Sequence, residues 1–203
     1  GFGNVGRAFV RLIEAKQGDL KSRYGIAPQI HAVVDIGGAA IADNHGLPLD
    51  QLRELMDSGQ SIERMASFGR PGMSGAAILQ SIPADVLVEA TPTNLVDGEP
   101  ARAHINAALK NGMDVITANK GPVVHGYQEL TSLASRSGLS FLFESAVMDG
   151  APVFSIARCG LPGATVSGFS GIFNSTTNLI LTRMEGGETQ DEAIAYAQSI
   201  GIA

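Results

Sequence analysis

Hydrophobic positions along the chain follow two patterns, one with the period of a helix and one typical of short buried strands. After the opening glycines, apolar residues recur at helical spacing and predict a helix from Asn4 to Lys16 that Gly18 ends. The segment IHAVVDI at 30–36 is short, apolar and rich in β-branched residues, so it predicts a strand that stops at the following glycines.

The same alternation continues through the middle of the chain. Two short helices are predicted in the weakly patterned stretch 39–82, and strands then alternate with helices. These elements are the helices Leu49–Asp57 and Ser74–Ser81, the strand Asp85–Ala90, the helix Glu99–Asn111, the strand Met113–Thr117, the helix Tyr127–Ser137 and the strand Leu139–Ser145. Because connecting helices cover both faces of a parallel sheet, the pattern predicts an α/β domain with a doubly wound parallel sheet.

The pattern changes near Val147, where we place a domain boundary. Small and β-branched residues at 164–173 have no long crossover helix before them and predict a separate sheet. A capping box, Thr189 with Glu192, predicts a last helix up to Ser199. We therefore expect a first domain at 1–146 and the N-terminal part of an α+β domain at 147–203. Since the opening glycines have no strand before them, we expect the first strand to be missing and the second domain to be truncated.

The composition of the chain argues against two classes of binding partner, nucleic acids and membranes. The chain is 44% hydrophobic and 17% charged, with a formal net charge of -6. Without clustered Lys and Arg, it shows no surface suited to nucleic acid. No apolar run is long enough to span a bilayer, so we expect no membrane partner and a cytoplasmic location. The charged residues Arg53, Glu63 and Arg64 are interpreted as a solvated face.

The glycine motif GFGNVG leads directly into the first predicted helix. In a Rossmann dinucleotide-binding domain, Gly1 allows the tight turn, Gly3 lets the backbone approach a pyrophosphate and Gly6 lets the helix pack on its strand. Asp35 ends the next predicted strand, where an acidic residue binds ribose hydroxyls. The alternative is a glycine-rich turn with a surface aspartate.

Asp35 also bears on the choice of cofactor. Its carboxylate repels a 2′-phosphate, and no Lys or Arg stands at 36–41. NAD is therefore favoured over NADP, unless Asp35 points away from the ribose.

Two polar segments end predicted strands. Thr117-Ala118-Asn119-Lys120 and Thr91-Pro92-Thr93 each follow a strand, at the edge of the sheet where ligands collect. A lysine there can bind a carboxylate or polarise a carbonyl. The alternatives are a solvated lysine and a plain turn.

Several longer segments resemble homoserine dehydrogenase over essentially the whole chain. They are GFGNVGRAF, VEATPTN followed by GEPA, ALKNGMDVITANKGP, ESAVMDGAP, GIFNSTTNLILTRM and AQSIGIA. TANKGP and GIFNSTTN are more specific than the glycine motif, because unrelated dinucleotide-binding proteins do not share them in this order.

The resemblance implies roles for individual residues. The residues implied to contact the dinucleotide are Phe2, Gly3, Asn4, Val5, Gly6 and Gly201. The residues implied to lie beside the nicotinamide are Thr91, Pro92 and Thr93. Lys120 would reach the nicotinamide and the substrate and assist catalysis. A monovalent cation, Na⁺, would be held largely by main-chain oxygens of Glu144, Val147, Asp149 and Ala151.

Departures from the family pattern affect the cation site and the catalytic set. The usual glycine triplet before Ile-Pro reads Met148-Asp149-Gly150-Ala151-Pro152, and the usual NGTTN reads NSTTN at 174–178. The substrate-binding glutamate and aspartate of the family, and its acid/base lysine, correspond to positions after Ala203.

The resemblance implies an NAD(P)-dependent homodimer that interconverts L-homoserine and L-aspartate 4-semialdehyde in threonine, methionine and isoleucine biosynthesis. One alternative is another amino-acid or aldehyde dehydrogenase of the same architecture. The other is a catalytically silent nucleotide-binding module.

Overall fold

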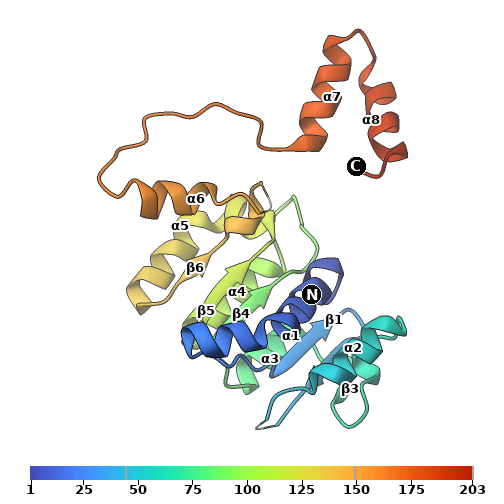
Figure 1. Cartoon of the computed structure of the whole chain (residues 1–203), viewed down its shortest axis with the longest axis vertical. Coiled ribbons are helices and arrows are strands. Elements are labelled where there is room, and N and C mark those ends of the chain that lie inside the picture. The colour runs from blue at the N-terminus through green and yellow to red at the C-terminus, as the bar shows by residue number, and fades with distance from the viewer. Residues whose placement is uncertain (44, 149, 203) are drawn as a thin grey trace. The chain divides into compact units, whose positions relative to one another are not determined.

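The computed structural model describes residues 1–43, 45–148 and 150–202, and the chain divides into two compact units, Gly1–Ala146 and Val147–Ala203 (Figure 1). The first unit holds α1 (Asn4–Tyr24), β1 (Ala32–Asp35), β2 (Gly38–Ile41), α2 (Leu49–Asp57), η1 (Ile62–Arg64), β3 (Gly69–Pro71), α3 (Gly75–Ser81), β4 (Val86–Glu89), α4 (Ala101–Lys110), β5 (Asp114–Thr117), α5 (Lys120–Ser137), β6 (Phe141–Leu142) and η2 (Glu144–Ala146). The second unit holds α6 (Val153–Ser155), the π-helical turn η3 (Ile156–Gly160), α7 (Ser175–Glu185) and α8 (Gln190–Ser199).

One of the two sheets of the first unit is parallel and has the strand order β4-β5-β6. Glu89 at the end of β4 stands beside Thr117 at the end of β5, so the carboxyl ends of these two strands are level. This sheet confirms the predicted α/β class. The strand predicted at 139–145 is shorter than expected, because only Phe141 and Leu142 pair with β5.

A second sheet, with the order β1-β2-β3, is antiparallel. The strand predicted at 30–36 does end at the glycines, but the chain then turns back through Ile36 and Gly37 into β2, which was not predicted. The sequence of β2, Gly-Ala-Ala-Ile, has little intrinsic strand propensity. Its two alanines are fully buried, which indicates that tertiary packing stabilises the strand.

Two helix boundaries also differ from the predictions. Helix α1 continues through Gly18 and ends at Gly25, whose φ of 69° is the left-handed conformation that closes a helix. Gly18 therefore does not stop the helix, since an internal glycine costs only about 1 kcal/mol. Helix α5 begins at Lys120 rather than Tyr127, because the Asn119 side chain accepts a hydrogen bond from the Gly121 amide and caps it.

Alanine substitutions at a glycine inside α1 and at the glycine that follows α5 should have opposite effects. Gly18→Ala should stabilise the chain by up to about 1 kcal/mol, because Gly18 is helical and its new methyl group meets no atom within 4 Å. Gly138→Ala should destabilise it by about 1 kcal/mol, because Gly138 closes α5 with a φ of 66°. Thermal unfolding of both variants measures the difference, and a loss of stability in Gly18→Ala would contradict the helix boundary.

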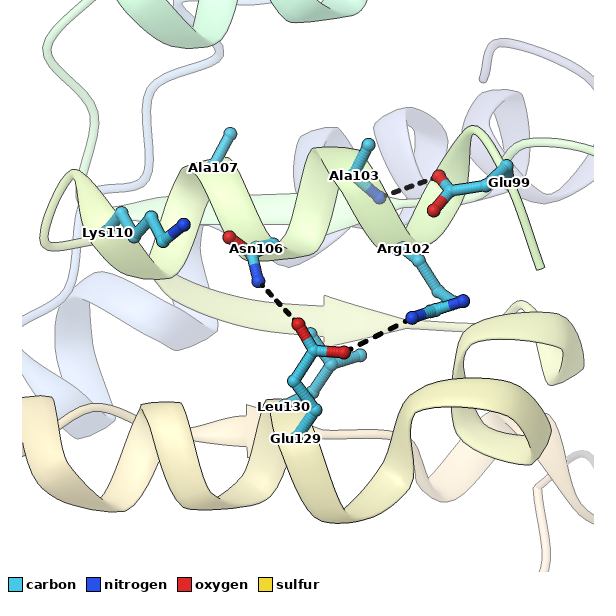
Figure 2. A pocket seen from close by; sticks show the side chains of 8 residues that line it. All are labelled: Glu99, Arg102, Ala103, Asn106, Ala107, Lys110, Glu129 and Leu130. Carbon is cyan, nitrogen blue, oxygen red and sulfur yellow. Dashed lines mark hydrogen bonds and ion pairs between the residues drawn. The ribbon is translucent and has the colours of Figure 1, made fainter. Parts of the chain in front are cut away.

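Helices α4 and α5 pack side by side and share polar contacts on their outer surface. The Glu129 carboxylate accepts hydrogen bonds from Arg102 Nη2 at 3.2 Å and from Asn106 Nδ2 at 3.0 Å (Figure 2). A cavity of about 300 Å³ lies along this seam; it is lined by Glu99, which precedes α4, by residues of α4 up to Lys110 and by Glu129 and Leu130 of α5. None of the residues predicted to bind the dinucleotide lines it.

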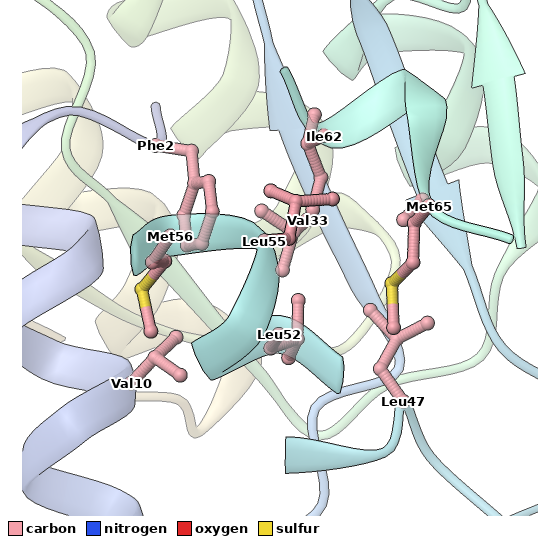
Figure 3. Close-up of a cluster of buried hydrophobic side chains, with 10 residues drawn as sticks. Phe2, Val10, Val33, Leu47, Leu52, Leu55, Met56, Ile62 and Met65 are labelled. Atoms are coloured by element: carbon pink, nitrogen blue, oxygen red, sulfur yellow. The ribbon is translucent and has the colours of Figure 1, made fainter. Parts of the chain in front are cut away.

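Two clusters of buried side chains stabilise the first unit. Figure 3 shows the cluster around α2, in which Phe2 and Val10 from the N-terminal segment meet Leu55 and Met56. The other cluster lies between the parallel sheet and the helices α3, α4 and α5. It comprises Leu79, Ile105, Ala108, Leu109, Met113, Val115, Leu130, Ala134 and Phe141.

The second unit is helical in the part that the structure describes. The capping box at α8 is confirmed, with Thr189 and Glu192 bonding each other reciprocally, and these bonds lower the pKa of Glu192. The strand expected at 164–173 is wrong: no strand occurs among residues 150–202, and that segment is exposed throughout. A strand needs a neighbour for its backbone hydrogen bonds, and this segment has none there. No helix in the described part of the chain is long and apolar enough to cross a membrane.

Candidate functional site

The glycine turn before α1 has one glycine with open space and two that are tightly packed. A Cβ on Gly1 would lie 2.3 Å from the Ala90 carbonyl oxygen, and one on Gly6 would lie 2.4 Å from the Gly1 oxygen. A Cβ on Gly3 would meet nothing within 4 Å. Packing therefore explains Gly1 and Gly6, whereas the backbone at Gly3 is open to an approaching group.

The open glycine lies at the N-terminus of a long helix. Gly3 is the N-cap of α1, and neither an acidic residue in the first turn nor a capping side chain occupies the first amides there, among the described residues. Free amides and the helix dipole make such a terminus suited to a phosphate. The turn also packs directly on the end of β4 through Gly1, which brings it beside the Thr91 turn.

Phe2 is also predicted to bind the dinucleotide, but its side chain is buried and does not face a ligand. Its ring is 2% exposed and packs in the α2 cluster (Figure 3). Its carbonyl oxygen accepts a hydrogen bond from Arg7 Nε at 3.0 Å. Asn4 and Val5 are exposed on the first turn of α1. The Phe2 side chain is therefore part of the core, so a dinucleotide can meet this residue only through its main chain.

Asp35 ends β1 close to the glycine turn. The carboxylates of Glu89 and Asp35 both lie within electrostatic reach of Gly1. The structure brings together the glycine turn, the end of β1 and the end of β4.

A second acidic residue lies at the turn that follows Asp35. The Glu63 carboxylate fills the space beside Gly37, where a Cβ would be 2.5 Å from Glu63 Oε1. Glu63 Oε2 is buried and has no hydrogen-bond partner among the described residues. The interpretation of Glu63 as part of a solvated face is therefore wrong, because the glycines at 37 and 38 leave room for its side chain to pack inward.

A hydrogen-bond network joins the ends of β4 and β5. Glu89, only 2% exposed, accepts hydrogen bonds at Oε1 from the Thr91 amide at 3.0 Å and the Thr91 hydroxyl at 2.5 Å. Its Oε2 accepts one from the Thr117 hydroxyl at 3.3 Å. The Thr117 hydroxyl in turn accepts a hydrogen bond from the Asn119 amide at 3.0 Å. One buried carboxylate thus fixes both polar segments that the sequence singled out.

Asn119 connects this network to α5. Its Nδ2 lies 3.0 Å from the Thr91 carbonyl oxygen and 3.4 Å from that of Pro92, while its Oδ1 caps the helix at Gly121. The side chain is 2% exposed, so these bonds are protected from water. The Thr91-Pro92-Thr93 turn and the start of α5 are therefore held together as one rigid element.

Lys120 is the first residue of α5 and its side chain is exposed. A cation at a helix N-terminus is electrostatically unfavourable, because the helix dipole is positive there. The position therefore does not stabilise the helix. It presents an ammonium group next to the Asn119 network, at the carboxyl edge of the parallel sheet, where an anionic or carbonyl group can bind.

His104 on α4 is a titratable side chain that lies within electrostatic reach of Glu89. Its burial lowers the pKa of the imidazole, although the Glu89 carboxylate acts in the opposite direction. The neutral form of His104 is favoured as a result, so the imidazole does not neutralise Glu89.

The remaining predicted residues lie outside this network. Gly201 follows α8 in the second unit, with a φ of 75°. Of the expected cation ligands, Glu144 opens η2 in the first unit, while Val147 and Ala151 belong to the second. The Met148 carbonyl oxygen accepts a hydrogen bond from the Ala151 amide at 2.9 Å. Asp149 lies outside the described residues, so the cation site stays a prediction.

Sequence reasoning did not single out Glu89, and it did not predict the burial of the Glu63 carboxylate. Glu89 had a detectable signal, because it is the one acidic side chain at the end of an apolar strand, DVLVEA, and faces a polar turn. Glu63 had no such signal, because its burial depends on contacts with Gly37 and Gly69. Gly37 is distant from Glu63 in the chain, and Gly69 is positioned by the pairing of β2 with β3.

The chain is similar to known proteins over its whole length. Residues 1–144 match the family model "Homoserine dehydrogenase, NAD binding domain", and residues 152–203 match the model "Homoserine dehydrogenase". The chain is 37% identical over its whole length to the NAD(+)-dependent homoserine dehydrogenase of Pseudomonas canavaninivorans, of which it covers 57%. It is also 37% identical to the homoserine dehydrogenase of Methanocaldococcus jannaschii, covering 60% of that protein.

Solved structures are similar over the whole chain. A putative homoserine dehydrogenase from Archaeoglobus fulgidus aligns with a TM-score of 0.80 at 30% identity, and the chain covers 59% of it. A hyperthermophilic archaeal homoserine dehydrogenase in complex with NADPH aligns with a TM-score of 0.81 at 29% identity, with 60% covered. The chain thus spans a little under two thirds of the length of these relatives, and both family models together match nearly all of it. The chain belongs to the homoserine dehydrogenase family.

Proposed function

We propose that the protein is an oxidoreductase that interconverts L-homoserine and L-aspartate 4-semialdehyde with NAD(P), a reaction of threonine, methionine and isoleucine biosynthesis. The observation that carries the proposal is the open backbone at Gly3, at the N-terminus of α1 and beside the Thr91 turn. This combination suits a dinucleotide pyrophosphate on the helix and a nicotinamide at the end of β4.

The residues of the chain would bind and orient the reactants. The main chain of Phe2 and Gly3, together with Asn4, Val5, Gly6 and Gly201, would contact the dinucleotide, and Thr91, Pro92 and Thr93 would lie beside its nicotinamide. The bound cofactor supplies or accepts the hydride. Lys120, held at the start of α5 by the Asn119 cap, would stabilise negative charge on the substrate oxygen.

A spectrophotometric assay of the full-length enzyme tests the proposal. Homoserine should reduce NAD(P) at a rate that saturates with substrate. Turnover of other amino alcohols but not homoserine would indicate a different dehydrogenase of the same architecture. Dinucleotide binding without turnover of any substrate would indicate a silent nucleotide-binding module.

The acidic residues at the end of β1 favour NAD over NADP. Asp35 lies near the glycine turn, Glu63 adds a second carboxylate beside Gly37, and no Lys or Arg occurs at 36–41. Arg70, a basic residue on β3 of the same sheet, donates hydrogen bonds to the main-chain oxygens of Ser67 and Gly69. A 2′-phosphate would therefore meet negative charge there.

Asp35→Asn should shift the cofactor preference toward NADP by about tenfold, because a repulsive charge is removed while the side-chain shape is kept. The ratio of kcat/KM values for NAD and NADP measures the shift. Asp50→Asn, an exposed change on α2 that removes the same charge, is the matched control and should leave the ratio unchanged. An unchanged ratio in Asp35→Asn would place this carboxylate away from the ribose.

Domain organisation, assembly and ion binding belong to the same proposal. We infer a dinucleotide-binding domain at 1–146 and part of a catalytic and dimerisation domain at 147–203, in a cytoplasmic homodimer. A monovalent cation such as Na⁺ would bind at Glu144, Val147, Asp149 and Ala151, since oxygen ligands suit a hard cation. Sedimentation of the full-length enzyme tests the dimer, and turnover in sodium against choline buffer tests the cation.

A further inference from the structure

Glu89 is a buried acid whose two side-chain oxygens both accept hydrogen bonds from neutral groups. Its two oxygens accept bonds from the Thr91 amide, the Thr91 hydroxyl and the Thr117 hydroxyl, and all three donors are neutral. Hydrogen bonds donated to a carboxylate favour its ionised form. The side chain is 2% exposed, so water screens the negative charge only weakly.

No cationic side chain among the described residues neutralises this charge. Among the described residues, no Lys, Arg or His forms an ion pair with Glu89. His104 lies within its electrostatic reach but is held toward the neutral form by burial. A buried, unpaired carboxylate is costly to maintain, and a ligand that brings a positive charge would reduce the cost.

The nicotinamide ring differs in charge between its two oxidation states. It is a cation when oxidised and neutral when reduced, so a fixed negative charge nearby stabilises the oxidised form selectively. Glu89 bonds directly to Thr91, which opens the turn proposed to border that ring.

We propose that Glu89 is a specificity-determining residue for the oxidation state of the cofactor: its unpaired carboxylate at the joined ends of β4 and β5 favours oxidised over reduced dinucleotide. The inference rests on the proposed function, because it requires the nicotinamide to lie at the Thr91 turn. It requires no contact between Glu89 and the ring, since a charge in a buried site acts over several ångströms.

Calorimetric titration of the full-length enzyme with NAD⁺ and with NADH tests the inference without turnover. Glu89→Gln keeps the shape of the side chain and an oxygen acceptor for Thr91 but removes the charge. The ratio of the Kd for NAD⁺ to the Kd for NADH should rise by about tenfold, mainly through weaker NAD⁺ binding.

Two controls separate charge from structure. Thr117→Val removes the hydrogen bond to Oε2 but keeps the carboxylate, so any loss of affinity should affect both oxidation states equally. Glu54→Gln removes an exposed charge on α2 and should change neither Kd. An equal loss of both affinities in Glu89→Gln would overturn the inference and leave Glu89 with a structural role only.

A further variant covers the case in which Glu89→Gln does not fold. His104→Lys adds a cation within electrostatic reach of Glu89 while leaving its hydrogen bonds intact, so it should raise the same ratio. An unchanged ratio in that variant would overturn the inference. If the wild-type enzyme bound neither NAD⁺ nor NADH, the proposed function itself would be wrong, and the inference would be wrong with it. That outcome differs from an unchanged ratio of the two Kd values, which would overturn the inference alone.

Discussion

Replacing Gly3 with valine is expected to weaken dinucleotide binding by about ten- to a hundredfold while the protein remains folded. The new side chain meets no atom of the chain, because a Cβ at this position has no neighbour within 4 Å. The backbone also tolerates the change, since the φ of Gly3 is -78°. The two methyl groups of the valine would occupy the place where a pyrophosphate must approach the amides of α1.

Two measurements are needed for this variant, NAD affinity by calorimetry and thermal unfolding. Gly6→Val is the matched comparison, because its Cβ would lie 2.4 Å from the Gly1 oxygen and should destabilise the fold itself. A folded Gly3→Val variant with unchanged NAD affinity would show that the cofactor does not lie over this turn.

Lys120→Ala should lower kcat by two to three powers of ten, about 3 to 4 kcal/mol, with a smaller change in KM. The effect falls on turnover if the ammonium group meets more negative charge in the transition state than in the bound substrate. Stability should not fall, because Lys120 is exposed and a cation is unfavourable at the start of α5. Lys120→Arg should recover only part of the activity, since a planar guanidinium does not replace a compact ammonium.

Steady-state kinetics of the full-length enzyme with homoserine measures this effect. Lys110→Ala, an exposed lysine in the last turn of α4, is the control for the loss of a positive charge and should retain full turnover. If Lys120→Ala changes only the affinity for the dinucleotide and leaves kcat intact, then Lys120 binds cofactor and does not assist the chemistry.

The sequence by itself determined the elements whose signals are local. The strands β4 and β5, the helix at Leu49–Asp57 and the capping box at Thr189 all follow from periodicity or from residues within one turn of each other. The glycine turn and the polar ends of two strands were also recognisable, because their spacing and position do not depend on distant parts of the chain.

Predictions from local signals were wrong where packing with distant residues, or a capping residue nearby, determined the helix or strand. The glycine at 18 resembles a helix end, yet α1 passes through it to a glycine that has the required left-handed conformation. The small, β-branched stretch at 164–173 has strand-like composition, but no neighbouring strand pairs with it in the described part of the second unit. Strand β2 forms despite weak propensity, because two neighbours and a buried position support it.

Only the tertiary structure decided how the candidate site is assembled. Glu89 and Thr117 are 28 residues apart in sequence, and the parallel register of β4 and β5 places them side by side at the carboxyl edge. Asn119 then ties the Thr91 turn to the start of α5, which is why Lys120 begins a helix instead of following a free strand end. Residue spacing alone specifies neither strand register nor burial, because both depend on which side chains the folded chain brings together.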